Sequence, residues 1–142
     1  MTRISFYVLK GEHEQDRQVF ACRLIEKAYY QGHQIYIHTE NKQQAEQLNQ
    51  TLWAFRDDSF VPHEMISTSH DNVACPIIVG HDVMPPKVMN LLINLASTQP
   101  KFFSQFERVA EFINDDPLIK TAGRERYRFY QQCGYQLDTF TI

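Results

Sequence analysis

The run Gly123-Arg124-Glu125-Arg126-Tyr127-Arg128 concentrates cationic side chains around one aromatic ring. On a helix, which turns by about 100° per residue, one face carries Lys120, Arg124, Tyr127 and Arg128. Such a face suits either the carboxylates of an acidic peptide or the stacked bases of a nucleic acid. A solvated helix surface without a ligand is the third interpretation, and charge alone does not choose among the three.

The opposite face of the same helix is apolar and should pack on the rest of the fold. Its members are Leu118, Ile119, Ala122, Phe129, Tyr130 and Cys133. Arg126 falls among these positions, so we expect its guanidinium to reach solvent or to pair with a carboxylate at the edge of the packed face. We therefore do not assign Arg126 to a ligand site.

Residues that could support metal or hydrolytic chemistry are present but poorly arranged. None of the six histidines has another at the i, i+4 spacing that directs two imidazoles to one metal ion from a helix. The neighbours His70-Asp71 and His81-Asp82 lie near serines, yet adjacent residues of a strand point to opposite faces. We expect no catalytic residue, no metal ion and no cofactor.

A phosphate-binding loop is also missing. The first predicted strand leads into Lys10-Gly11-Glu12-His13-Glu14, which has one glycine followed by two nearby carboxylates. A phosphate cradle needs several glycines with open backbone amides and usually a lysine, and these carboxylates would repel a phosphate. A small nucleotide-binding enzyme or nuclease is therefore kept only as the alternative function.

Composition narrows the possible classes of protein. The net charge is −3, so no overall positive field draws the molecule onto nucleic acid, and we expect any contact with DNA to be indirect. The three cysteines are widely spaced, as is typical of reduced thiols in the cytosol. No signal peptide or membrane-spanning apolar run is found, which predicts a cytoplasmic protein without membrane contact.

The elements that must position these residues alternate between strand and helix. A compact apolar run at residues 4–9 predicts a buried strand, and helical spacing follows over residues 15–31, just before a glycine. A second strand is expected at residues 34–38. Either Thr39 or Asn41 can cap the next helix, whose apolar face contains Ala45, Leu48, Leu52 and Trp53.

The second half of the chain is less regular. Residues 57–71 are interpreted as a surface loop, and residues 76–79 as a short buried strand. Residues 91–95 and 108–113 are predicted strands, although periodicity alone would also allow short helices. Asp115-Asp116-Pro117 then caps the basic helix, which should stop at a glycine before a closing strand.

That closing strand is expected at residues 135–142, after Gly134. No internal repeat, linker or low-complexity tract interrupts the chain. Residues 1–142 are therefore predicted to form a single domain, an α/β sandwich with a mixed sheet.

A second unusual segment places the tryptophan and two phenylalanines around a loop. It comprises Leu52-Trp53-Ala54-Phe55 and Ser59-Phe60-Val61-Pro62-His63. Such a cluster can anchor the loop to the core or form a protein-binding patch, and both interpretations stay open at this point.

Together, the aromatic segment and the Arg124-Glu125-Arg126-Tyr127 motif resemble the chi subunit family of bacterial DNA polymerase III. Gly134, Leu137, the opening Phe6-Tyr7-Val8-Leu9 and the chain length agree with that family, so the resemblance spans the whole chain. It implies a Rossmann-like three-layer α/β/α sandwich with a mixed, mostly parallel sheet. It also implies an accessory subunit of the clamp-loader assembly with no catalysis of its own.

The resemblance further implies two protein partners. Lys120, Arg124 and Tyr127 match the helix that binds the acidic C-terminal tail of single-stranded-DNA-binding protein, with Arg128 as a peripheral contact. Residues similar to those lining the pocket for the last phenylalanine of that tail are Ile113, Leu137 and Thr139. The expected interface with the psi subunit consists of Trp53, Phe60 and Pro62, where buried aromatic side chains would dominate affinity.

Overall fold

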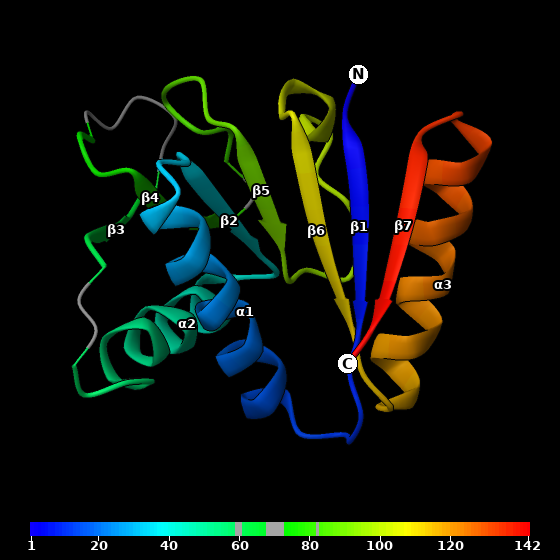
Figure 1. Cartoon of the computed structure of the whole chain (residues 1–142), viewed down its shortest axis with the longest axis horizontal. Coiled ribbons are helices and arrows are strands. Elements are labelled where there is room, and N and C mark those ends of the chain that lie inside the picture. Colours follow the sequence, from blue (N-terminus) through cyan, green and yellow to red (C-terminus); the bar gives the residue numbers. More distant parts are fainter. Residues whose placement is uncertain (59–60, 68–72, 82) are drawn as a thin grey trace.

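A single sheet flanked by helices organises the computed structural model, which describes residues 1–58, 61–67, 73–81 and 83–142 (Figure 1). Within those residues the sheet has seven strands. Their bounds are Arg3–Val8 (β1), Ile35–Thr39 (β2), His63–Met65 (β3), Ile77–His81 (β4), Leu91–Asn94 (β5), Arg108–Ile113 (β6) and Gln136–Thr141 (β7).

The strands lie in the order β3-β4-β2-β5-β6-β1-β7, and all the described pairs are parallel. The predicted α/β class is confirmed, but the sheet is not mixed within the described residues. The sequence assigned no strand an antiparallel direction; the closing strand β7, for example, enters the sheet after a helical crossover and runs parallel to its neighbour β1. All carboxyl ends therefore lie along one edge.

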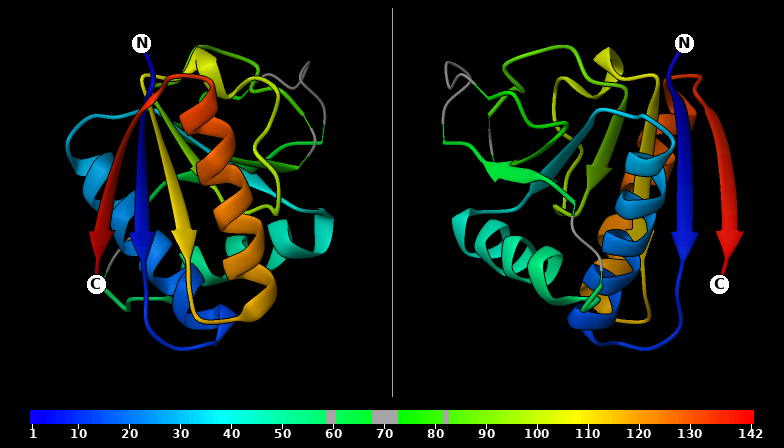
Figure 2. Two further views of the ribbon diagram at one scale, coloured as in Figure 1. Left: turned by 90° about the vertical axis from the view of Figure 1, so that its right-hand side faces the viewer. Right: turned by 60° about the vertical axis from the view of Figure 1, so that its left-hand side comes forward.

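Helices cover both faces of the sheet, which confirms the three-layer prediction (Figure 2). Helices α1 (Glu14–Tyr30) and α2 (Lys42–Ala54) pack on one face, and α3 (Pro117–Gln132) packs on the other beside the 3₁₀ turn Phe103–Gln105. No helix in the described residues is long and apolar enough to cross a membrane.

Helix ends follow the expected capping chemistry. Asn41 Oδ1 accepts a hydrogen bond of 2.9 Å from the Gln44 amide at the start of α2. Asp116 Oδ1 likewise accepts from the Leu118 amide at 2.9 Å at the start of α3. Past the end of α3, Gly134 has a φ of 83°, a left-handed backbone conformation that residues with a side chain rarely adopt. The predicted position and limits of the basic helix are thus confirmed.

The central strands contribute side chains to two separate hydrophobic cores, one on each face of the sheet. Ile35 and Ile37 of β2 pack toward α1 and α2, whereas Tyr36 between them packs toward α3. Because neighbouring side chains of a strand point to opposite faces and both faces are covered, these strands are apolar without alternation. The same argument explains why β5 and β6 are strands, the alternative favoured from the sequence.

One strand was missed. Residues 57–71 were interpreted entirely as a loop, but His63–Met65 form β3 at the edge of the sheet. Its sequence, His63-Glu64-Met65, contains no apolar run, and only His63 is buried while Glu64 is exposed. A strand so short and polar is recognisable only from its pairing with β4.

Gly80 provides a test of packing within β4. A Cβ atom at this position would clash with the Tyr36 hydroxyl oxygen and lie 3.1 Å from its Cζ. Tyr36 is fully buried and donates a 2.5 Å hydrogen bond to the Val83 carbonyl, so it cannot easily move. We expect Gly80→Ala to reduce the free energy of unfolding in urea by about 2 kcal/mol.

A double-mutant cycle identifies the cause. Tyr36→Phe removes the clashing oxygen, so Gly80→Ala should cost less in the Tyr36→Phe background than in the native chain. Equal costs in the two backgrounds would show that the Tyr36 hydroxyl does not limit the space at Gly80.

Candidate functional site

Helix α3 lies close against β6. Its buried line consists of Gly123, Arg126 and Tyr130. A Cβ atom at Gly123 would lie 2.5 Å from Cδ1 of Ile113, so the absence of a side chain is what allows this approach. The helix is therefore rotated about its axis so that a glycine and an arginine face the sheet.

The buried face of α3 therefore differs from the predicted apolar face, which was partly wrong. Tyr130 is buried as expected, and Ile119 and Ala122 are half-buried. By contrast, Leu118 is 83% exposed and Phe129 is 37% exposed, while Cys133 is also exposed. Side-chain polarity was a poor guide to burial here. Arg126 is buried because it has a buried carboxylate partner, whereas the apolar Leu118 and Phe129 are exposed.

That partner is Glu111, in the middle of β6. Arg126 Nε donates to Glu111 Oε1 at 2.8 Å, and the two side chains are 3% and 0% exposed. The other carboxylate oxygen accepts hydrogen bonds from the Tyr130 hydroxyl at 2.7 Å and from Asn94 Nδ2 at 2.9 Å. The predicted pairing of Arg126 with a carboxylate is thus confirmed, although it lies in the interior rather than at the edge.

The buried network extends to the loop after β5. Arg126 Nη1 donates to the Ser97 carbonyl at 2.9 Å, and Glu40 accepts from both the amide and the hydroxyl of Ser97 at 2.7 Å. Burial opposes ionisation of Glu40, but the hydrogen bonds from Ser97 and the charges of His38 and Arg126 lower its pKa overall. Helix α3 is therefore tied to the carboxyl edge of the sheet.

The cationic residues predicted to bind the tail differ in exposure. Arg124 and Arg128 are exposed, and neither forms an ion pair within the described part of the chain. Lys120 is half-buried, with Nζ 3.7 Å from Asp115 Oδ1. Tyr127 does not project fully outward as expected, because its ring is half-buried and meets Phe6 edge-on with centroids 5.2 Å apart.

The predicted pocket residues lie next to this helix. Ile113 ends β6, and Leu137 lies in β7 opposite Ile4 of β1. Both are half-buried and pack in the same apolar cluster as Tyr127. Thr139 is exposed two residues further along β7. Tyr127, Ile113 and Leu137 therefore belong to one apolar cluster on the α3 face of the sheet, and the exposed Arg124 and Arg128 lie on the same helix as Tyr127.

The predicted psi-binding residues lie at a different surface, near the end of α2. Trp53 is 49% exposed, and its ring centroid is 4.5 Å from that of His63. Pro62 is half-buried, and Phe60 lies outside the described residues. His63, which belongs to the aromatic segment but was not among the predicted psi-binding residues, is buried with Nδ1 2.7 Å from the Val61 carbonyl oxygen.

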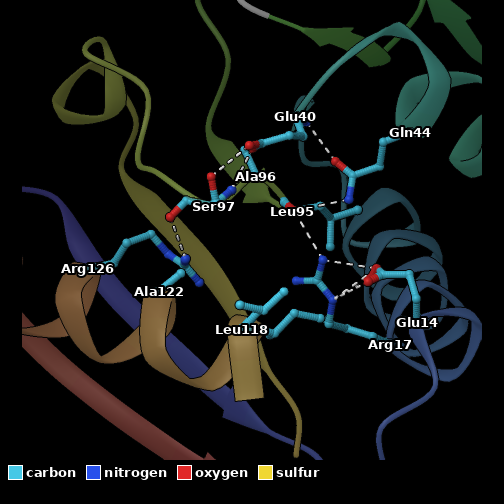
Figure 3. A pocket seen from close by; sticks show the side chains of 11 residues that line it. Glu14, Arg17, Glu40, Gln44, Leu95, Ala96, Ser97, Leu118, Ala122 and Arg126 are labelled. Carbon is cyan, nitrogen blue, oxygen red and sulfur yellow. Dashed lines mark hydrogen bonds and ion pairs between the residues drawn. The ribbon is translucent and has the colours of Figure 1, made fainter. Parts of the chain in front are cut away.

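A crevice opens at the carboxyl edge of the sheet, where helices from both faces begin (Figure 3). We call it the carboxyl-edge crevice; its volume is about 240 Å³. The lining residues are Glu14, Arg17, Glu40, Gln44, Leu95, Ala96, Ser97, Leu118, Ile119, Ala122 and Arg126. Nucleotides bind at such a place in many open α/β sheets.

The polar groups of this crevice are occupied by one another. Arg17 is 4% exposed, and its guanidinium donates to Glu14 and to the carbonyls of Phe112 and Leu95 at 3.0–3.1 Å. Gln44 Nε2 also donates to the Leu95 carbonyl, at 3.2 Å. These interactions leave few hydrogen-bond donors for a phosphate, and the carboxylates of Glu14 and Glu40 would repel one.

The residues weighed from the sequence for metal or hydrolytic chemistry lie only partly within the described residues. No group of three or more His, Cys, Asp or Glu residues among those that the structure describes could hold a metal ion. The neighbours His70-Asp71 and residue Asp82 lie outside the described residues. Cys22, Cys75 and Cys133 are free thiols, and burial raises the pKa of Cys22 to about 12.

Comparison with known proteins defines first a class and then a family. The chain resembles a solved structure titled "The crystal structure of T4 UvsW", with a TM-score of 0.71 at 10% identity. The match covers 99% of this chain but 41% of that one, and at this identity it shows the fold alone. The class is thus a Rossmann-like α/β domain.

The family model described as DNA polymerase III chi subunit, HolC, matches residues 1–138. The chain is 39% identical over 138 residues to the DNA polymerase III subunit chi of Pseudomonas aeruginosa, covering 97% of this chain and 95% of that protein. It is 27% identical over 145 residues to the subunit chi of Escherichia coli K12, covering 99% of each. The chain belongs to the DNA polymerase III chi subunit family, a family of DNA replication proteins.

The Glu111–Arg126 pair yields a stability prediction. Arg126→Met keeps most of the aliphatic stem but leaves the Glu111 carboxylate buried without its cation, so we expect a loss of about 3–5 kcal/mol in the free energy of unfolding in urea. Arg124→Met is the matched control, since Arg124 is exposed on the same helix, and it should change stability by less than about 0.5 kcal/mol.

Neutralising the buried carboxylate tests the explanation. Glu111→Gln in the Arg126→Met background should recover part of the lost stability, because no unpaired charge is then buried. If Arg126→Met lowers the free energy of unfolding no more than Arg124→Met does, the buried ion pair does not stabilise the fold.

Proposed function

We propose that the protein is a non-catalytic accessory subunit of DNA polymerase III that binds the acidic C-terminal tail of single-stranded-DNA-binding protein and the psi subunit. The observation that carries the tail-binding proposal is the juxtaposition of exposed cations with half-buried apolar side chains on one flank of α3. Family membership supplies the context, since chi proteins are named as polymerase III subunits.

We call the proposed tail-binding surface the tail-binding flank; its residues are Lys120, Arg124, Tyr127, Arg128, Ile113 and Leu137. It offers the chemistry that such a ligand requires. Arg124 and Arg128 project into solvent, where guanidinium groups can form paired hydrogen bonds with carboxylates. Tyr127, Ile113 and Leu137 supply the apolar contact for a terminal phenylalanine. In this proposal Lys120 exchanges or shares its Asp115 partner with the carboxylates of the tail.

The second proposed surface faces the psi subunit at the end of α2. Trp53 is a large aromatic side chain exposed over nearly half its area, a type of residue that often dominates the affinity of protein interfaces. Its contact with the buried His63 ring holds it against β3, so little side-chain freedom is lost on binding. Pro62, adjacent to His63, extends the same surface.

Two features support an adaptor rather than an enzyme. The polar groups of the carboxyl-edge crevice are largely satisfied by one another, which disfavours a bound nucleotide. The net charge of −3 also disfavours extended binding to a phosphate backbone. We propose that the protein contacts DNA indirectly, through the protein that coats the single strand.

The tail-binding proposal predicts a specific loss of affinity. Arg124→Ala should weaken binding of a peptide with an acidic tail ending in phenylalanine by about 1.5–3 kcal/mol, measured by isothermal titration calorimetry, because a charge-assisted hydrogen bond is removed. Arg23→Ala is the control, since it removes an exposed positive charge from α1 and should leave the affinity nearly unchanged.

Two results would argue against the tail-binding flank. Wild-type affinity of Arg124→Ala for the tail peptide would remove Arg124 from the site. Tight, strongly salt-dependent binding of naked single-stranded DNA, with no binding of the peptide, would instead favour direct recognition of nucleic acid by the basic helix.

The psi-binding proposal is tested in the same way. Trp53→Ala should weaken binding to purified psi subunit by at least about 2 kcal/mol, because a partly exposed aromatic residue at an interface centre contributes strongly. Tyr30→Ala removes another exposed aromatic side chain, from α1, and should have little effect. If Trp53→Ala weakens binding of the psi subunit no more than Tyr30→Ala does, Trp53 does not lie at the centre of the psi interface.

A further inference from the structure

We propose that the carboxyl-edge crevice is a further protein-binding site, which accepts a peptide segment carrying a lysine or arginine next to an apolar residue. This site is separate from the two surfaces of the proposed function and does not depend on either. It lies between α3 and the amino ends of α1 and α2, as Figure 3 shows.

An exposed leucine at the rim of the crevice supplies the first part of the argument. Leu118 is 83% exposed, although it belongs to the first turn of α3 and lines the cavity. Ala122 and Ile119 continue an apolar wall from the same helix, and Leu95 and Ala96 form the opposite wall from the loop after β5. Covering Leu118 with an apolar side chain of a partner removes this surface from water.

Hydrogen bonding determines which polar group can enter. Arg17 uses Nε, Nη1 and Nη2 on Glu14 and on backbone carbonyls, and Arg126 uses Nε and Nη1 on Glu111 and Ser97. The amide and hydroxyl of Ser97 are both directed to Glu40. Arg126 has N–H groups beyond these contacts, since a guanidinium carries five, but its side chain is only 3% exposed. The carboxylates of Glu14 and Glu40 are more exposed, and each oxygen can accept a further hydrogen bond. A ligand that donates hydrogen bonds is therefore favoured.

Charge leads to the same conclusion. Arg17 and Arg126 contribute two positive charges, whereas Glu14, Glu40 and the buried Glu111 contribute three negative charges. The hydrogen bonds from Ser97 help keep Glu40 ionised, because its pKa is lowered despite burial. An ammonium or guanidinium group at the crevice complements this charge, whereas a phosphate or carboxylate would be repelled.

The crevice and the tail-binding flank use different sides of α3. Leu118 and Ala122 face the loop after β5, whereas Tyr127 contacts β1 and packs with Leu137 of β7. A basic segment in the crevice and an acidic tail on the other flank can therefore bind at the same time. One helix would then connect two partners of opposite charge.

Titration of the full chain with a blocked tetrapeptide, acetyl-Leu-Arg-Leu-Arg-amide, tests the proposal. Saturable changes in the backbone amide resonances of Gln44, Ala96 and Ala122 are expected at millimolar peptide. The matched peptide acetyl-Leu-Glu-Leu-Glu-amide should cause none, because its carboxylates would face Glu14 and Glu40. Leu118→Ala should weaken binding of the basic peptide roughly fivefold by removing apolar contact.

Further variants separate charge, apolar contact and the tail-binding flank. Glu40→Gln should weaken the basic peptide roughly threefold, while Val88→Ala, which trims another strongly exposed apolar residue, should not. Arg124→Ala should bind the basic peptide normally, so failure here is distinguishable from failure of the tail-binding proposal. Equal response to the acidic peptide, no saturable response, or wild-type affinity of both Leu118→Ala and Glu40→Gln overturns the proposal.

Discussion

The buried ion pair between Glu111 and Arg126 is the constraint on which the orientation of the third helix depends. A carboxylate in the middle of a central strand is costly to bury unless its oxygens are satisfied. Here Arg126, Tyr130 and Asn94 supply three hydrogen bonds, and two of these residues belong to α3. The helix must therefore present that side to the sheet, and Gly123 permits the close approach that brings the side chains within reach.

This orientation decides what the rest of the helix shows to its surroundings. With Arg126 directed inward, Arg124 and Arg128 remain exposed on one side, and Leu118 remains exposed on another. Arg126 also links the interior to the loop after β5, because it donates to Ser97. The same interaction thus orients the helix face proposed to bind the acidic tail, and it places Arg126 in the lining of the carboxyl-edge crevice. Polar groups that could have received a phosphate there are used to hold the fold together.

Much of the fold could be predicted because its signals are local. The cap at Asp116, the stop near Gly134 and the apolar runs of the central strands each depend on residues close together in the sequence. The short strand β3 was missed because its three residues carry no apolar pattern and are recognised through pairing with β4. The all-parallel sheet depends on which strands pair, and pairs such as β7 with β1 join residues far apart in the sequence.

The candidate site shows the same division. The sequence by itself determined that the chain has an amphipathic helix with a cationic side, and its motifs resembled the chi family, which the comparisons confirm. It could not determine the rotation of that helix, since polarity alone placed Leu118 and Phe129 inside. Only the tertiary structure decided that Arg126 is buried and Leu118 is exposed, because Glu111 comes from a strand that contacts the helix only after folding.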